Sequence, residues 1–518
     1  MFKIGFSLSA GFDTVVSNAQ NTVGSISLTN DAFEGFTLFS VYKKTYLINN
    51  CGQVINEWTS EFLPGNSVYL LPNGNLLRAS SEKGLSSIFF GGVGGKVELF
   101  NWEGDLIWHY DYNTDNYRQH HDIYPMPNGN ILILAATLVS ESAAISLGRD
   151  PSKLTEGELY NERIIEIEPF GTSEANLVWE WNVIDHVVQD FDNTKFNFAD
   201  VSRSEGKLDI NFLNGGNGGA NWLHCNSIQY NDKLDQIVIS SRNLSEIWVI
   251  DHSTTSLEAA SSSGGLYGKG GDFLYRWGNA QSYKQGTEED RKLYGQHSSH
   301  FIKEGLDDEG KIMLFNNGNG RTPAFSEVYI LNPPATNGNY SYTENTAFGP
   351  ENPDYVFSDL SENPSPFYSN IVSGAQKLPN GNILICQGKQ GYFFEIDENG
   401  NKVWEYVNPV SSNNGSIASQ LDSQPNNLTF RATKYTIDYA AFIGKDLTPS
   451  LPIENNSNTN ACDALSLESV NLDLTKVYPN PVNHFLQLNL PNNSDFKIEI
   501  FDLLGKNILT TNNKNKSL

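Results

Sequence analysis

Three histidines stand at the start of short apolar segments, and an arginine follows one of them along the chain. His121 lies in the run Gln-His-His-Asp-Ile, His224 in Trp-Leu-His-Cys-Asn-Ser-Ile, and His297 in Tyr-Gly-Gln-His-Ser-Ser-His. Arg242 comes soon after His224. A neutral imidazole is a competent nucleophile and a general acid or base near neutral pH, and a guanidinium binds anionic oxygens through a fork of donors. Together these residue types indicate group transfer on an anionic substrate, provided that the fold brings them together.

A repeated segment indicates the scaffold that would position them. Residues 71–77, 126–132 and 378–384 each read Leu or Met, then Pro-Asn-Gly-Asn, then two aliphatic residues. Each is typical of two strands joined by a tight turn whose Asn-Gly residues accept positive φ. A third strand follows each hairpin, and then a fourth strand that often ends in Trp. Six such units within residues 35–446 predict an all-β fold, a six-bladed β-propeller.

The ends of the propeller sequence predict how the ring closes. The first unit, from Gly35 to Trp58, lacks its opening strands. The segment 430–442 has the composition of a strand and can supply the missing one. Because this pairing joins the two ends of the chain, it leaves no sheet edge exposed.

The expected register of the repeats places the histidines. Alignment of the Pro-Asn-Gly turns puts Asn66, His121 and Ser373 at one height, with His224 close to it, whereas His297 precedes a longer hairpin. The first strand of each blade lines the central channel, so residues at one end of these strands converge. A single histidine at a strand end is more often structural. Three at equivalent channel positions indicate a site.

Composition narrows the possible partners. The formal net charge is −26, and such a surface repels nucleic acid and anionic membranes, so no nucleic-acid partner is expected. An anionic substrate therefore needs local positive charge, such as that of Arg242. The four cysteines form no Cys-x-x-Cys pair, no metal site is predicted, and no cofactor is expected. No apolar segment is long enough to span a bilayer.

The two ends of the chain indicate export. Residues 1–34 form an N-terminal segment with a candidate signal peptide that ends near residue 19. Residues 447–476 are predicted to be a linker, because Asn, Ser, Thr and Pro are frequent there. Residues 477–518 contain Tyr-Pro-Asn-Pro and Asp-Leu-Leu-Gly-Lys. This tail resembles the C-terminal sorting domain of the type IX secretion system, in a truncated form. The resemblance implies a secreted or cell-surface protein, exported through the periplasm by that machinery.

Five segments of the propeller carry a second family resemblance. They are His121-Asp122-Ile123 before a Pro-Asn-Gly turn, Trp222-x-His224-x-Asn226-Ser227-Ile228-x-Tyr230, Ser240-Ser241-Arg242, Gln296-His297, and residues 315–321. In their order and spacing they resemble the bacterial aryl-sulfate sulfotransferase family. The resemblance implies ping-pong transfer of a sulfuryl group from a phenolic sulfate ester to a phenol, without a nucleotide donor. It implies His297 as the nucleophile that becomes sulfohistidine, and His121, His224 and Arg242 as ligands of the sulfonyl oxygens.

Further residues near these motifs are candidates for smaller roles. His121 is the preferred general acid and base for the phenol oxygens. The candidate substrate-binding residues are Asn226, Arg321 and Tyr124. Each has a structural alternative: a turn for the first, the Asn-Gly-rich loop for the second, and core packing for the third. His120 and His300 are expected on the opposite strand face from the site.

Other classes of function fit parts of this pattern. A non-catalytic secreted propeller that binds glycans or proteins has no need of three histidines and Arg242 together. A quinoprotein would need quinone and metal ligands that the sequence does not offer. Hydrolysis of aryl sulfates differs from transfer only in the access of water to the intermediate, which the sequence does not show. The oligomeric state is not predicted.

Overall fold

The computed structural model describes most of the chain between the candidate signal peptide and the linker. The described residues are 21–82, 84–362 and 365–457, together with the backbone of four short strands between residues 476 and 513. The end predicted for the signal peptide lies outside these residues, as does most of the predicted linker. No helix in the described part of the chain is long and apolar enough to cross a membrane.

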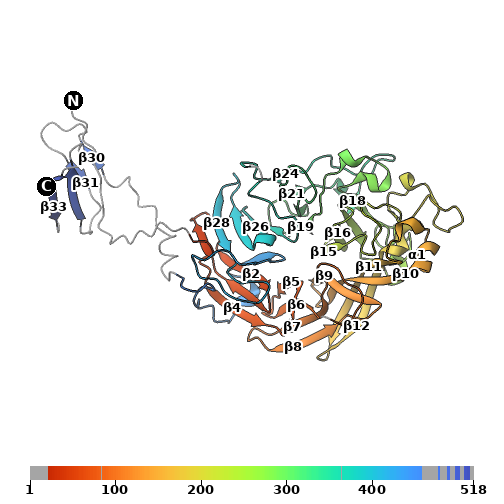
Figure 1. Cartoon of the computed structure of the whole chain (residues 1–518), viewed down its shortest axis with the longest axis horizontal. Helices are drawn as coiled ribbons and strands as arrows, with labels where there is room; N and C mark the ends of the chain where they lie inside the picture. The colour runs from red at the N-terminus through yellow and green to blue at the C-terminus, as the bar shows by residue number, and fades with distance from the viewer. Residues whose placement is uncertain are drawn as a thin grey trace. The chain divides into compact units, whose positions relative to one another are not determined.

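Six sheets follow one another around a ring and make a six-bladed β-propeller, as predicted (Figure 1). Blade 1 contains β29 (Ala432–Thr436), β2 (Gly35–Val41), β3 (Lys44–Ile48) and β4 (Val54–Thr59). Blade 2 contains β5 (Leu63–Leu70), β6 (Leu76–Ser81), β7 (Gly95–Phe100) and β8 (Leu106–Asp111). Blade 3 contains β9 (Tyr117–Pro125), β10 (Ile131–Ser140), β11 (Glu158–Phe170) and β12 (Glu174–Asn182).

The remaining blades have the same antiparallel order. Blade 4 contains β15 (Cys225–Asn231), β16 (Gln236–Ser241), β17 (Glu246–Asp251) and β18 (Tyr275–Trp277). Blade 5 contains β19 (His297–Phe301), β20 (Ile312–Asn316), β21 (Glu327–Leu331) and β24 (Tyr355–Phe357). Blade 6 contains β25 (Gly374–Lys377), β26 (Ile383–Gln387), β27 (Tyr392–Ile396) and β28 (Lys402–Val407). In Figure 1 the inner strands β5, β9, β15 and β19 lie nearest the centre of the ring.

Both ends of the propeller chain contribute to closing the ring. The C-terminal strand β29 pairs with β2 as the inner strand of blade 1, which is the closure that the sequence predicts. A second strand, β1 (Gly24–Leu28), pairs with β28 and adds a fifth strand to blade 6. The strand β1 therefore belongs to the propeller although it precedes the range 35–446 given for that domain from the sequence.

The repeated tryptophans explain how neighbouring blades hold together. Five fourth-strand indoles each donate a hydrogen bond across a blade junction: Trp58 to Asn101 O, Trp108 to Glu174 O, Trp179 to Thr254 Oγ1, Trp277 to Pro350 O and Trp404 to Asn50 O. Each indole buries a large apolar surface and still satisfies its N–H, so it suits a junction between two sheets. The inter-blade layers are otherwise aliphatic and aromatic.

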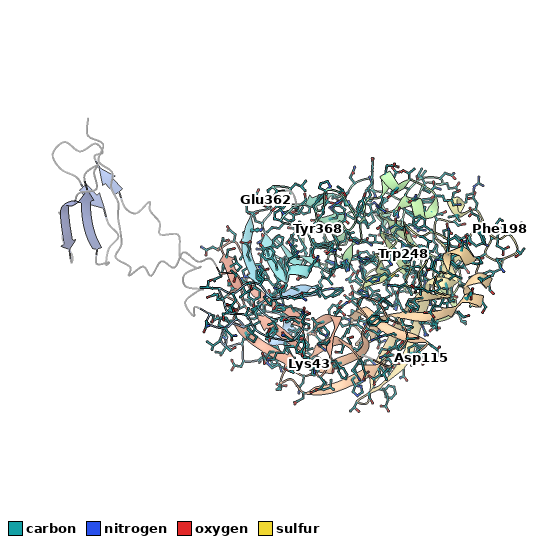
Figure 2. The ribbon with its side chains drawn as sticks, viewed as in Figure 1. Lys43, Asp115, Phe198, Trp248, Glu362 and Tyr368 are labelled. Atoms are coloured by element: carbon teal, nitrogen blue, oxygen red, sulfur yellow. The ribbon has the colours of Figure 1, made fainter. Side chains whose placement is uncertain are left out.

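Several short elements lie outside the six blade sheets. They are the helices α1 (Glu141–Ser146) and α2 (Ser256–Ala259), the strand pairs β13 (Val187–Val188) with β14 (Leu208–Asp209) and β22 (Ala335–Thr336) with β23 (Asn339–Tyr340), and 3-10 turns at Pro151–Lys153, Val183–His186, Val201–Arg203, Ala280–Tyr283, Glu288–Asp290, Gly388–Gln390 and Ala440–Phe442. Figure 2 shows exposed Phe198 at the outer edge, in the segment between β12 and β15, and buried Trp248 within blade 4. In the sorting tail, β30 (Lys476–Tyr478) pairs with β31 (Gln487–Asn489), and β32 (Phe496–Phe501) with β33 (Asn507–Asn513).

Candidate active site

The inner strands share a local irregularity that aims side chains into the channel. In five blades one residue of or beside the inner strand has a left-handed backbone: Asn66 (φ 95°), His121 (48°), His224 (50°), Ser298 (57°) and Ser373 (88°). The strand pairing shifts at the same places in β5, β9 and β19, and just after His224, between Cys225 and Ser227, in β15. An extra residue in one strand bends it and re-aims a side chain. The three residues predicted at one height all have this feature, and in β19 it falls on Ser298, next to His297.

The four residues predicted as catalytic lie together. The rings of His121 and His224 make an edge-to-face contact, with centroids 4.7 Å apart. Burial holds the pKa of both side chains well below the usual range, and the charges of Arg242 and His297 lower the pKa of each further. Burial, and then Arg242, also lowers the pKa of His297, to about 3. The three histidines are therefore neutral at pH 7, and the fixed positive charge beside them is that of Arg242.

The tautomer of His297 follows from its hydrogen bonds. The amide nitrogen of Asn317 donates to the carbonyls of Ser369, at 2.6 Å, and Val372, at 2.9 Å. Its oxygen lies 2.7 Å from His297 Nδ1 and therefore accepts a hydrogen from that nitrogen. The carbonyl of Gly295, 3.1 Å from the same nitrogen, also only accepts. Since Nδ1 of the neutral ring carries the hydrogen, Nε2 keeps its lone pair.

His224 and Arg242 present donors to the same space. The side-chain nitrogen of Asn221 lies 2.7 Å from His224 Nδ1 and donates to it, so the ring hydrogen is on Nε2. The Arg242 guanidinium donates from Nη1 to Asn243 Oδ1 at 3.1 Å. It forms no ion pair with a carboxylate of the described residues. A half-buried cation without a carboxylate partner favours an anionic ligand.

His120 and His300 occupy different environments. The expectation that His120 points to the opposite face is wrong, because its Nδ1 lies 3.0 Å from Nδ1 of His121. The register shift in β9 breaks the simple alternation of side chains on which that expectation rests. His300 lines a different cavity, described below, and donates from Nδ1 to the carbonyl of Ser298 at 2.8 Å.

A loop that the sequence did not single out covers the histidines. The ring of Phe90 lies 5.0 Å from the ring of His120, 6.3 Å from that of His121 and 5.6 Å from that of His224, between centroids. Gly92, at φ 89°, lies so close to His121 that a Cβ there would be 2.1 Å from the ring Nε2. The Phe-Phe-Gly-Gly sequence of this loop offered a signal, since paired glycines permit close approach of the backbone.

Of the three substrate-binding candidates, Asn226 lies beside the cluster. Asn226 is fully buried and donates from Nδ2 to the carbonyl of Gln296 at 2.7 Å, which holds the residue before His297. Its Oδ1 is buried and has no hydrogen-bond partner among the described residues. Arg321 instead forms an ion pair with Glu327 at 2.6 Å, and its guanidinium covers the Phe325 ring.

Tyr124 lines a cavity that the four predicted catalytic residues do not line. This cavity has a volume of about 900 Å³ and is lined by Tyr124, His300, Lys303, Arg431 and Tyr435 among others, with the Pro-Asn-Gly turns at its end. None of His121, His224, Arg242 or His297 lines it. The structure therefore does not bring Tyr124 to the histidine cluster.

The described residues hold no group of three or more His, Cys, Asp or Glu side chains arranged to bind a metal ion. Beside the three histidines, the charge of Arg242 opposes binding of a cation and favours an anion.

Two family models match the chain. The model described as Arylsulfotransferase (ASST) matches residues 15–435. The model described as Secretion system C-terminal sorting domain matches residues 476–518. No curated protein matches the chain.

Several solved structures are similar at low sequence identity. A protein of unknown function from Bacteroides caccae is 12% identical, with a TM-score of 0.41, over 77% of this chain and 98% of its own. The periplasmic gluconolactonase of Pseudomonas aeruginosa is 10% identical, with a TM-score of 0.37, over 78% and 99%. A virginiamycin B lyase from Staphylococcus aureus is 10% identical, with a TM-score of 0.33, over 74% and 88%. Similarity at this level carries no information about activity.

Proposed function

The chain belongs to the arylsulfotransferase family, and from this membership we propose that it moves a sulfuryl group from a phenolic sulfate ester to a phenol by a ping-pong mechanism. The reaction uses no nucleotide donor. The sorting domain marks the protein for export, so the reaction takes place at the cell surface or outside the cell. The observation that carries the proposal is the hydrogen bond from His297 Nδ1 to Asn317, because it leaves the other ring nitrogen as a lone-pair donor.

In the first half-reaction His297 Nε2 attacks the sulfur of the donor. An S–N bond forms, the S–O bond to the aryl group breaks, and the phenolate leaves with the electron pair. Because burial lowers the pKa of His297 to about 3, the lone pair is available throughout the neutral range. The weakly basic nitrogen is also a good leaving group, which suits an intermediate that must react again.

The groups around His297 stabilise the transferred SO₃. Arg242 supplies a fixed positive charge, and His224 supplies a hydrogen on Nε2. Preorganised donors at a site where negative charge accumulates cost no reorganisation during the reaction. Asn226 positions the segment before His297 through its bond to Gln296 O.

His121 transfers the proton. It protonates the departing phenolate in the first half-reaction and removes a proton from the phenolic acceptor in the second. The acceptor oxygen then attacks the sulfur, the S–N bond breaks, and His297 returns to its starting form. Both half-reactions use one site, as a ping-pong enzyme requires.

Mass spectrometry of the protein after brief exposure to 4-nitrophenyl sulfate, without acceptor and at alkaline pH, tests this function. We expect one SO₃ on the tryptic peptide 293–303, discharged when phenol is added. That peptide contains both His297 and His300, so His300→Gln is the matched variant: it should keep the adduct, whereas His297→Gln should lose it. If folded wild-type protein gives neither adduct nor 4-nitrophenolate, the proposal is wrong, and a non-catalytic propeller that binds glycans or proteins becomes the favoured function.

A further inference from the structure

A buried chain of three side chains leads away from the candidate site. His120 Nδ1 lies 3.0 Å from His121 Nδ1, and His120 Nε2 lies 2.9 Å from Glu162 Oε2. His120 is fully buried, and His121 and Glu162 are each 3% exposed. The other oxygen of Glu162 accepts from the backbone N–H of Cys225 at 2.8 Å. A buried carboxylate with this pairing needs an explanation, because burial of a charge is costly unless a partner compensates it.

The hydrogen positions in this chain follow from the carboxylate. Glu162 only accepts, so His120 Nε2 carries a hydrogen. One hydrogen lies between the two Nδ1 atoms. When it belongs to His121, both rings are neutral and His121 Nε2 is a base. When the chain holds one further proton, the shared hydrogen belongs to His120, that ring is an imidazolium against the carboxylate, and His121 is neutral with the added hydrogen on Nε2.

His121 by itself is poorly suited to hold a proton. Burial, together with His224, His120, His297 and Arg242, holds its pKa well below the usual range. The leaving phenolate nevertheless needs a proton at neutral pH. The titratable or charged groups that face the chain are Glu162 from β11, the Cys225 thiol from β15, and His224, His297 and Arg242 around His121. Among them only Glu162 carries negative charge, and it lies against His120.

We propose that Glu162 and His120 are positioning residues that hold, on His120, the proton that His121 gives to the leaving phenolate and later takes from the acceptor phenol. In the first half-reaction His121 Nε2–H goes to the phenolate oxygen while His120 Nδ1–H moves to His121 Nδ1. Both rings end neutral. In the second half-reaction each hydrogen moves back. The proposal rests on the proposed function and adds the place where the proton resides between turnovers, before the first half-reaction and after the second.

Other histidine–carboxylate contacts in the chain serve as controls. His252 lies 2.9 Å from Glu166 Oε2 and 2.7 Å from Asp235 Oδ1, and these carboxylates raise its pKa to about 9 despite burial. Its ring packs on Trp179 and Tyr230 rather than on the cluster. Glu166→Gln therefore removes a carboxylate from a largely buried histidine without touching the site.

The experiment measures kcat/KM of Glu162→Gln for a series of aryl sulfates with leaving groups of rising basicity. We expect a loss of at least about 10²-fold for phenyl sulfate and less than about 10-fold for 4-nitrophenyl sulfate, because only the basic phenolate needs the proton. Glu162→Asp, which keeps the charge, should recover part of the loss. The alkaline limb of the pH profile for phenyl sulfate should move to lower pH in Glu162→Gln and stay in place in Glu166→Gln.

Equal loss across the donors, or no loss with phenyl sulfate, would overturn the inference. If Glu162→Gln does not fold, His120→Asn gives the same comparison. Adduct formation on His297 from 4-nitrophenyl sulfate separates the two proposals. If the adduct forms in wild-type protein and in the variant while the leaving-group dependence is unchanged, the proposed role of Glu162 and His120 is wrong and the ping-pong function stands. If wild-type protein forms no adduct, the function itself is wrong.

Discussion

Arg242 has two effects on the site: it stabilises the negative charge that develops during the reaction, and it lowers the pKa of His297. In Arg242→Gln the fixed charge beside the three histidines is lost. Removal of one preorganised donor from a site of developing negative charge costs about 2.7–4 kcal/mol, so kcat should fall by about 10² to 10³. The same charge lowers the pKa of His297 in the folded protein. We therefore expect the pKa of His297 to rise above its present value of about 3 in the variant.

The structure predicts that this loss of activity comes without a comparable loss of stability. Arg242 makes one side-chain hydrogen bond, to Asn243 Oδ1 at 3.1 Å, and no ion pair with a described carboxylate. Loss of such a hydrogen bond costs about 0.5–1.5 kcal/mol. Relief of a half-buried cation among three imidazoles acts in the opposite direction. The midpoint of thermal unfolding should therefore change by only a few degrees.

Arg242→Lys is the matched control. It keeps the charge but replaces the planar fork with a single ammonium. We expect the pKa of His297 to stay low, and kcat to lie between those of the wild type and Arg242→Gln. Release of 4-nitrophenolate in the first turnover gives the rate, and imidazole ¹⁵N shifts across a pH titration give the pKa. An Arg242→Gln variant that unfolds early, or that loses activity while the pKa of His297 stays the same, would refute the reasoning.

Four further outcomes follow from the same geometry. Gly92→Ala should abolish activity, because the added Cβ would lie 2.1 Å from His121 Nε2. Gly104→Ala is the control: Gly104 has a similar φ of 93° and nothing within 4 Å of an added Cβ, so this variant should lose stability but keep its activity. Thermal unfolding and turnover will be measured for both variants. Asn317→Ala should lower the rate of adduct formation by about tenfold, since loss of an oriented buried hydrogen bond is worth about 1.4 kcal/mol, and single-turnover kinetics will measure it. His121→Gln should slow poor leaving groups more than good ones in a donor series, and equal loss across the donors would contradict its acid role. Adduct formation from 4-nitrophenyl sulfate should keep its rate from about pH 8 to about pH 5, because His297, with a pKa of about 3, is neutral throughout this range.

The blades were predictable because each depends on local chemistry. An Asn-Gly turn needs positive φ, and the residues that tolerate it recur at fixed places in the sequence. The fourth-strand tryptophans also repeat, although the sequence did not show that Trp404, for example, donates to Asn50 O in the next blade. Closure by β29 followed from the missing strand of the first unit. The strand β1 was not predicted, because five residues beside an outer edge carry no pattern that distinguishes them from a loop.

The candidate site was less predictable, since its geometry depends on departures from the repeat. Regular alternation put His120 on the far face, whereas the register shift in β9 brings its ring to His121. Phe90 and Asn317 contact histidines that are distant in the chain. Such contacts between separate segments have no periodic signal in one sequence. The four predicted catalytic residues came from motif spacing, and motif spacing contains nothing about the side chains that orient them.

The contact between Glu162 and His120 is one part of the site that the sequence of the intervening strand could have predicted. The strand β10 lies between β9, which carries His120, and β11, which carries Glu162, so a contact between the two side chains must cross it. Ala136 of β10 pairs with Glu162 on one side and with Arg118 on the other. A methyl group leaves room for an imidazole to reach a carboxylate two strands away, whereas a leucine or isoleucine fills that space. Consecutive alanines in an otherwise aliphatic strand, beside a histidine pair and a glutamate at matching register, therefore indicate a buried polar chain.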